Sequence, residues 1–180
     1  MKNFTKYLLI MVIPLAVLLS RPVIPLMTLT LGQEVKLSTV PFDPRDIFRG
    51  DYVELSFAIE EIGYEMISPG LLSKLREELR NDKSIEVYVS LKPDNSGIYN
   101  AAFVSDAPPA GDVVYVRGRA ESHIRSERVM IKYGNRLSHF YVRENTGLEL
   151  EEAARKGEVY SLAKVWKGFI VLDDVVPFVK

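Results

Sequence analysis

The segment PRDIFRGDYVELSF, from Pro44 to Phe57, gathers side chains whose types and spacing suggest chemistry. Within fourteen residues it holds two arginines, two aspartates, a glutamate and a tyrosine. Carboxylates such as those of Asp46 and Asp51 can serve as general acids or bases. Arginine and tyrosine are favoured anchors at protein interfaces. The candidate partner-binding residues of this segment are Arg45, Arg49, Tyr52 and Glu54.

The same charges also predict a structural corner that turns the chain into a strand. An arginine fork matches a carboxylate through two hydrogen bonds, so alternating aspartates and arginines can form an ion-paired network. Gly50 permits a positive φ or a close approach of two backbones. We favour this structural interpretation over partner binding, and partner binding over catalysis, and we assign no catalytic residue. The corner comprises Asp43, Arg45, Asp46, Arg49, Gly50, Asp51 and Leu55.

The composition argues against several kinds of site and partner. The chain has no cysteine, which excludes disulfides and thiolate metal ligands. Its two histidines, His123 and His139, do not lie at a metal-ligand spacing. The formal net charge is -1 and there is no long basic run, whereas nucleic-acid binding needs clustered positive charge. We therefore predict no metal, no cofactor and no nucleic-acid partner.

The N-terminus has the pattern of a membrane anchor. Lys2 and Lys6 precede an uncharged run from Tyr7 to Ser20. As a helix this run rises about 21 Å, which is short of the roughly 30 Å hydrocarbon core, and an outward-reaching Arg21 reduces the deficit. The chain is again uncharged over residues 23–31, but two prolines make a continuous helix through this region unexpected.

A cleaved secretory signal is the alternative to an uncleaved anchor. A cleavage site needs a pair of small residues separated by one position, but Leu18 stands two positions before Ser20, and Arg21 and Pro22 follow. We predict an uncleaved anchor in the cell membrane. The basic residues before the apolar run place the N-terminus in the cytoplasm under the positive-inside rule, and the rest of the chain outside.

The remainder of the chain predicts one strand-dominated, mostly antiparallel α+β domain with two short helices. We place the anchor and the juxtamembrane segment within residues 1–33 and the domain within 34–180. From Asp51 to Ile59 the sequence alternates as one strand, with Val53, Leu55, Phe57 and Ile59 toward the core. Helices are expected over 68–81 and 146–157, and a final hairpin turns at Lys167 and Gly168.

Two further groups of side chains are candidate binding surfaces. Arg117 and Arg119 share a strand face with Val113 and Tyr115 and can pair with glutamates across the sheet. The aromatic set of Tyr133, His139 and Tyr141 can line a ligand surface, although strand parity also fits ordinary core positions for some of them. We favour paired or core roles for both groups.

The motif region resembles the GDYXXLXY family of bacterial membrane-anchored proteins. Gly50, Asp51, Tyr52 and Leu55 match the family motif, whereas Phe57 stands at the place of its final tyrosine. The segments VKLSTVPFDPRD, VYVRGRA and IKYGNRLSHFYVRENTGLELEEAARKG are similar to family segments in the same order. The resemblance implies an anchored extracytoplasmic domain of the cell envelope, a multi-spanning membrane protein as partner, and no specific reaction.

Together these observations predict a single-pass protein whose outer domain binds or supports another envelope component. A cell-envelope hydrolase acting on peptide or glycan is the alternative.

Overall fold

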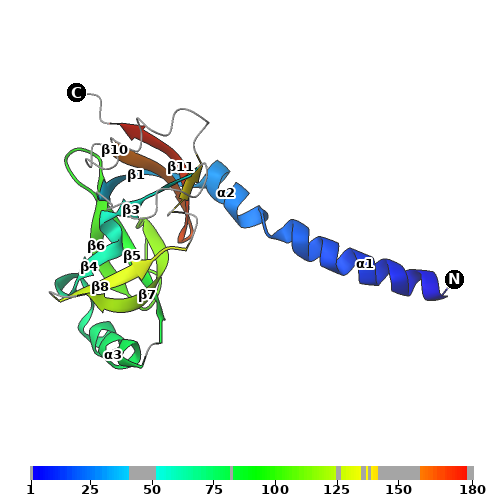
Figure 1. Cartoon of the computed structure of the whole chain (residues 1–180), viewed down its shortest axis with the longest axis horizontal. Coiled ribbons are helices and arrows are strands. Elements are labelled where there is room, and N and C mark those ends of the chain that lie inside the picture. Colours follow the sequence, from blue (N-terminus) through cyan, green and yellow to red (C-terminus); the bar gives the residue numbers. More distant parts are fainter. Residues whose placement is uncertain are drawn as a thin grey trace.

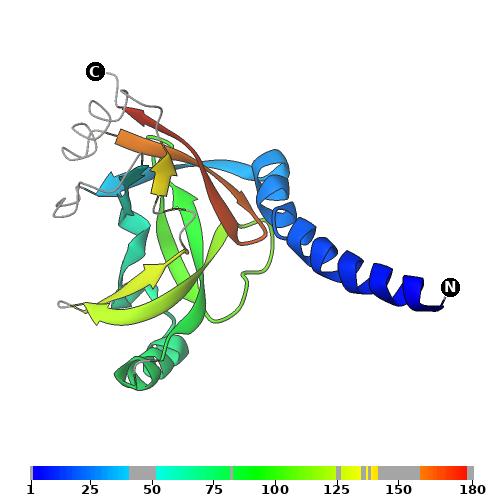
Figure 2. The same ribbon diagram turned by 45° about the vertical axis from the view of Figure 1, so that its right-hand side comes forward.

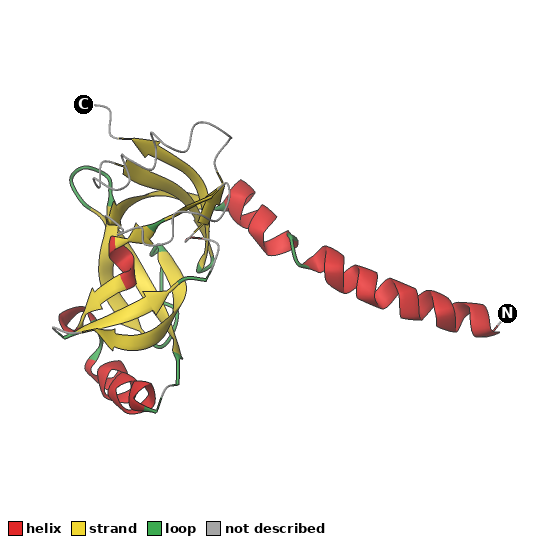
Figure 3. Cartoon of the chain, in the orientation of Figure 1, coloured by secondary structure: helices red, strands yellow, loops and turns green. Residues whose placement is uncertain are grey.

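A computed structural model describes residues 2–40, 52–81, 83–124, 127–134, 137, 139–141 and 159–177. A helical arm projects from a domain made mainly of strands (Figures 1 and 3). The strands pair antiparallel within their sheets. The predicted α+β class, with an N-terminal apolar helix before a strand-dominated domain, is confirmed.

The helical arm consists of α1 (Lys2–Ser20) and α2 (Val23–Leu31), separated by a turn at Arg21 and Pro22. Pro22 caps α2, and its carbonyl accepts a 3.0 Å hydrogen bond from the amide of Leu26. Pro25 is tolerated because it lies in the first turn, where a missing N–H breaks no helical bond. The helix is therefore interrupted at Arg21 and Pro22, as the prolines predict, but it continues through Pro25.

The segment Ile10–Leu31 has the length and composition needed to cross a membrane. Its 22 residues rise about 33 Å as a helix, compared with about 30 Å of hydrocarbon. Large apolar side chains are exposed along it, including Met11 at 70% and Leu18 at 68%. In water such a surface would be unfavourable by about 25 cal/mol for each Å² left uncovered.

One sheet contains four strands in the order β11-β10-β1-β3. β1 (Gln33–Val40) starts two residues after α2 ends, and β3 (Ser56–Phe57) pairs with its far end. The last two strands, β10 (Val159–Trp166) and β11 (Phe169–Pro177), form the predicted hairpin. Lys167 and Gly168 both have positive φ, 48° and 82°, as a two-residue hairpin turn requires.

The second sheet contains five strands in the order β4-β8-β7-β5-β6. These are β4 (Glu61–Gly63), β5 (Ile85–Pro93), β6 (Tyr99–Ser105), β7 (Tyr115–Ile124) and β8 (Arg128–Lys132). A two-stranded ribbon pairs β2 (Tyr52–Glu54) with β9 (His139–Tyr141). Parallel bridges Lys36↔Ile98 and Val116↔Gly168 join the two larger sheets.

A single hydrophobic core lies between the sheets. Both sheets contribute side chains to this core from alternate positions along their strands. In β10, for example, every second residue is buried. In β5 the alternation of apolar residues at 85, 87, 89 and 91 predicts an inward face, and the structure confirms it because Val87 and Val89 are fully buried. The largest fully buried side chains are Phe57, Leu37, Ile59, Ile62, Leu71, Leu75, Ile131 and Leu137.

Helix α3 (Pro69–Arg80) closes the end of the domain that lies away from α2 (Figure 1). Its buried leucines, Leu71, Leu75 and Leu79, form the apolar stripe that leucines spaced by four residues predict. Ser68 occupies the N-cap position, although its side chain makes no capping hydrogen bond. The other predicted short helix, over 146–157, lies outside the described residues.

Candidate functional site

The candidate corner lies mostly outside the residues that the structure describes. This holds for Asp43, Arg45, Asp46, Arg49, Gly50 and Asp51, whereas the backbone of Tyr52 and Glu54 is described in β2. In the β2–β9 ribbon, Tyr52 lies opposite Tyr141 and Glu54 lies opposite His139. The ribbon therefore places two motif positions beside two members of the predicted aromatic set.

The single strand predicted from Asp51 to Ile59 is wrong. Leu55 separates β2 from β3, and the two strands pair with different partners, β9 and β1. Ile59 then lies in a short 3-10 helix, η1 (Ala58–Glu60). The predicted burial is nevertheless correct, since Leu55, Phe57 and Ile59 are exposed by only 4%, 1% and 2%. Phe57, at the place of the motif tyrosine, is thus a core residue.

A buried polar cluster lies directly after the motif. Glu60 is only 4% exposed, and its Oε1 lies 3.7 Å from Nζ of Lys132. Burial raises the pKa of the Glu60 carboxyl above its ordinary 4.5, and the charge of Lys132 partly offsets that shift. The neighbouring Tyr133 is also buried, and its hydroxyl donates a 2.6 Å hydrogen bond to the carbonyl of Ile59.

These contacts explain Tyr133 as a core residue rather than as part of a ligand surface. Burial raises the pKa of the Tyr133 hydroxyl well above 10, so the group is neutral and acts as a hydrogen-bond donor. Gly118 of β7 lies against its ring, because a Cβ at that position would fall 3.0 Å from Cε1 of Tyr133. The cluster therefore ties the end of β8 to the segment that follows the motif.

A second group of polar and aromatic side chains lies on the outer face of β5 and β7. We call it the β5–β7 surface. Arg117 Nη1 lies 3.9 Å from Oε2 of Glu86, and the hydroxyl of Tyr88 donates a 2.9 Å hydrogen bond to Oε1 of Glu86. That hydrogen bond raises the pKa of the Tyr88 hydroxyl. The members of the surface are Glu86, Tyr88, Tyr115, Arg117, Arg119 and Phe169.

Aromatic contacts organise this β5–β7 surface. The rings of Tyr88 and Tyr115 are tilted with centroids 6.0 Å apart, and the guanidinium of Arg117 lies 4.7 Å from the ring centroid of Phe169. Such contacts are favourable by about 0.5–1.5 kcal/mol each. The surface therefore presents fixed rings and both signs of charge, a combination suited to recognising another protein.

Sequence parity found part of this surface. It placed Arg117 and Arg119 on one face with Tyr115, and their predicted pairing with a glutamate across the sheet is confirmed for Arg117. Because Val87 and Val89 face the core, the alternation of β5 also places Glu86 and Tyr88 on the outer face. No sequence signal pointed to Phe169, because it comes from the other sheet. Val113 precedes β7 and is 42% exposed.

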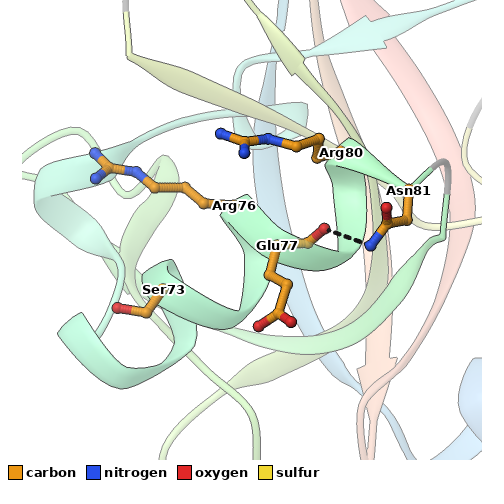
Figure 4. A pocket seen from close by; sticks show the side chains of 5 residues that line it. All are labelled: Ser73, Arg76, Glu77, Arg80 and Asn81. Carbon is orange, nitrogen blue, oxygen red and sulfur yellow. Dashed lines mark hydrogen bonds between the residues drawn. The ribbon is translucent and has the colours of Figure 1, made fainter.

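A shallow hollow on α3 has a different character (Figure 4). Side chains of this one helix line it: Ser73, Arg76, Glu77, Arg80 and Asn81. Arg76 also lies over the ring of Tyr64, with 5.2 Å between the guanidinium and the ring centroid. The Asn81 side chain donates a 3.1 Å hydrogen bond to the carbonyl of Glu77. These contacts are those of a solvated helix face.

Among the described residues, no three His, Asp or Glu side chains are placed to hold a metal ion. The two polar groups that are described thus differ in what they can do. The Glu60 cluster is buried and holds the fold, whereas the β5–β7 surface is accessible and can bind.

Comparison with known proteins adds one match. A family model described as GDYXXLXY protein matches residues 14–175, which is nearly the whole chain. The matched region includes most of the helical arm as well as the domain. No curated protein and no solved structure matches.

Proposed function

Since this chain belongs to the GDYXXLXY family, we propose that it is a single-pass membrane protein whose outer domain binds and supports a multi-spanning membrane protein. The exposed apolar helix supports the anchor. The resemblance to family members supports the choice of partner. Lys2 and Lys6 support a cytoplasmic N-terminus and an extracytoplasmic domain.

The observation that carries the proposal is the docking of α2 on the β10–β11 hairpin. Thr28 is completely buried at this contact side of α2, and its hydroxyl donates a 2.8 Å hydrogen bond to the carbonyl of Ile24. Gly32 alone connects α2 to β1. The domain is therefore coupled to the span without a linker, which holds its surfaces within reach of proteins embedded beside it.

The β5–β7 surface is the binding face that we propose within the described part of the chain. Arg117 and the tyrosines are residue types that contribute strongly to interfaces when a partner covers them. We also retain Arg45, Arg49, Tyr52 and Glu54 as a second proposed face, of which Tyr52 and Glu54 belong to β2 whereas Arg45 and Arg49 lie outside the described residues. Both faces lie on the domain that α2 fixes to the membrane.

Crosslinking in native membranes tests this proposal. A photo-activated amino acid replaces Tyr88 on the β5–β7 surface, or Tyr52 in the motif, and Ser73 on α3 serves as the control. We expect one membrane-protein adduct from Tyr88 or Tyr52 and none from Ser73. Recovery of the monomer alone from both test positions would contradict the proposal.

Orientation is tested separately with protease. We expect the domain to be cut in spheroplasts and protected in intact cells that retain an outer barrier. Protection in both preparations would place the domain in the cytoplasm and overturn the proposed orientation.

The corner itself is proposed as structural. Alanine at Asp46, Arg49 or Asp51 should lower the abundance of the folded protein, because each change leaves a charged partner unpaired. A catalytic role predicts instead a normally folded, inactive protein. A stable and functional Asp51→Ala variant would refute both roles for that residue.

A further inference from the structure

The turn of the β10–β11 hairpin lies on the side of the domain from which the helical arm leaves. Figure 2 shows the hairpin end and the loop that leads into β7 on this side, next to α2, while α3 is at the opposite end. The register agrees, because Gln33, two residues after Leu31, pairs with Val165 near the end of β10. The turn and the arm thus share one end of the domain.

The contact between α2 and the hairpin leaves little freedom for rearrangement. A Cβ on Gly32 would press against the carbonyl oxygen of Thr28 and lie 3.1 Å from Cβ of Lys164. Lys164 in turn is fixed by a 3.0 Å hydrogen bond from Nζ to Oε2 of Glu34. The direction of α2 therefore determines which part of the hairpin faces the membrane.

The side chains at the turn match those found at a membrane interface. Trp166 and Phe169 flank it, and Nζ of exposed Lys167 lies 4.9 Å from the ring centroid of Trp166. Trp residues concentrate at the head-group level, where an amphipathic ring is favoured, and a lysine can bind phosphate there. Gly168 bridges to Val116 of β7, which brings exposed Val113 to the same end.

The length of the arm places this end at the right depth. If Lys6 lies at one hydrocarbon boundary, about 20 residues at about 1.5 Å each, counted through the turn at Arg21 and Pro22, reach the other boundary near Leu26. Arg21 is then about 7 Å inside that boundary, within reach of the head groups by its own length. The last residues of α2, and the hairpin beside them, come to lie in the head-group layer.

We propose that the β10–β11 turn is a membrane-contacting element, in which Trp166 and Lys167 enter the phospholipid head-group layer. The inference rests on the anchoring proposed above. The contact is local, because residues 34–180 carry 20 basic and 24 acidic side chains, a net charge of -4 that opposes broad adsorption to an anionic surface. A protein partner covering the turn is the competing explanation, which the test distinguishes.

Trp166 is the only tryptophan of the chain, so its fluorescence reports on this turn alone. The full-length protein is reconstituted in phosphatidylcholine–phosphatidylglycerol vesicles that contain brominated lipids. We expect stronger quenching by bromines close to the head group than by bromines near the chain ends. We also expect Lys167→Glu to reduce the quenching and Lys167→Arg to retain it.

A second variant separates failure of this inference from failure of the anchor. With Trp166→Phe and Leu18→Trp together, the only tryptophan lies in α1 and should be quenched most by bromines deep in the bilayer. If that variant is quenched and Trp166 is not, the turn does not touch lipid and the inference is wrong. If neither is quenched, the anchoring itself is wrong, and the inference falls with it.

Two other outcomes would also overturn the inference. Equal quenching in the Lys167→Glu and wild-type proteins would show that Lys167 takes no part in the contact with lipid. Trp166 that is unquenched in pure lipid, but shielded from aqueous acrylamide in native membranes, would show that a protein covers the turn.

Discussion

The hydroxyl of Tyr133 donates a 2.6 Å hydrogen bond to the main-chain carbonyl of Ile59, 74 residues earlier in the chain. Both groups are buried, so the bond satisfies a donor and an acceptor that water does not reach. It joins the residue after β8 to the residues that follow the family motif. The motif therefore leads into a segment that the rest of the domain holds firmly.

Replacing Tyr133 with phenylalanine should lower the free energy of unfolding by about 1–2 kcal/mol, because the buried carbonyl of Ile59 loses its partner. Urea denaturation of the full chain in detergent measures the change. Tyr115→Phe is the matched control and should have little effect, since Tyr115 lies on the outer surface. Equal stability of the Tyr133→Phe variant and the wild type would mean that this hydrogen bond contributes nothing.

Glu60 should make stability depend on pH. Its pKa is raised in the folded state, so over the range between its ordinary 4.5 and the raised value the folded protein binds more protons than the unfolded chain. The free energy of unfolding therefore falls as pH rises through this range, and the loss is complete above it. Glu60→Gln, which has no charge to bury, should abolish this part of the decline.

Denaturation midpoints measured at a series of pH values check the effect of Glu60→Gln. Glu77→Gln, on the exposed side of α3, should leave the wild-type decline in place. If Glu60→Gln follows the wild-type curve throughout, the buried carboxyl is not its source.

Gly32→Ala should weaken the docking of α2 and cost about 1–3 kcal/mol, because the added methyl group has no space beside Thr28 and Lys164. Thermal unfolding and protease susceptibility of the membrane-embedded protein measure the loss. Gly70→Ala, in the first turn of α3, provides the matched control because nothing lies within 4 Å of its added Cβ. That variant should be neutral or slightly more stable. A wild-type response from Gly32→Ala would show that the contact with the hairpin is loose.

Arg117→Ala should weaken binding of the proposed partner while leaving the stability of the domain nearly unchanged. Its ion pair with Glu86 is exposed, so the free energy of unfolding should change by less than about 1 kcal/mol. Loss of an arginine at a binding hot spot costs about 2 kcal/mol or more of binding free energy, so yield of the partner adduct should fall at least about tenfold if Arg117 is such a residue. Lys83→Ala, at another exposed ion pair, should leave the yield unchanged. Normal adduct formation by Arg117→Ala would exclude the β5–β7 surface as the binding face.

Local patterns predicted much of the domain. The leucine spacing of α3, the alternation in β5 and the Lys167–Gly168 turn each follow from neighbouring residues, and the structure contains all three. The alternation from Asp51 to Ile59 also predicted that Leu55 and Phe57 are buried. These features depend on the 3.6-residue period of helices, the two-residue period of strands and the backbone preferences of single residues, all of which can be read from neighbouring residues in the sequence.

Other features depend on partners that are distant in the sequence. The alternation from Asp51 to Ile59 does not reveal that β2 pairs with β9 whereas β3 pairs with β1. The charge of the buried Glu60 is paired with Lys132, which lies at the end of β8, 72 residues later in the chain. Phe169 belongs to the other sheet and still contacts Arg117 of the β5–β7 surface. Resumption of the helix after Pro22 likewise relies on α2 packing against β10 and β11.

The absence of a linker between α2 and β1 also has a mechanical consequence. With Gly32 as the only intervening residue and Thr28 buried, α2 packs directly against the β10–β11 hairpin. A membrane helix changes its tilt when bilayer thickness changes. In the anchored protein that we propose, a tilt of α2 is passed on to the domain, and α3, at the end of the domain away from α2 (Figure 1), is displaced most.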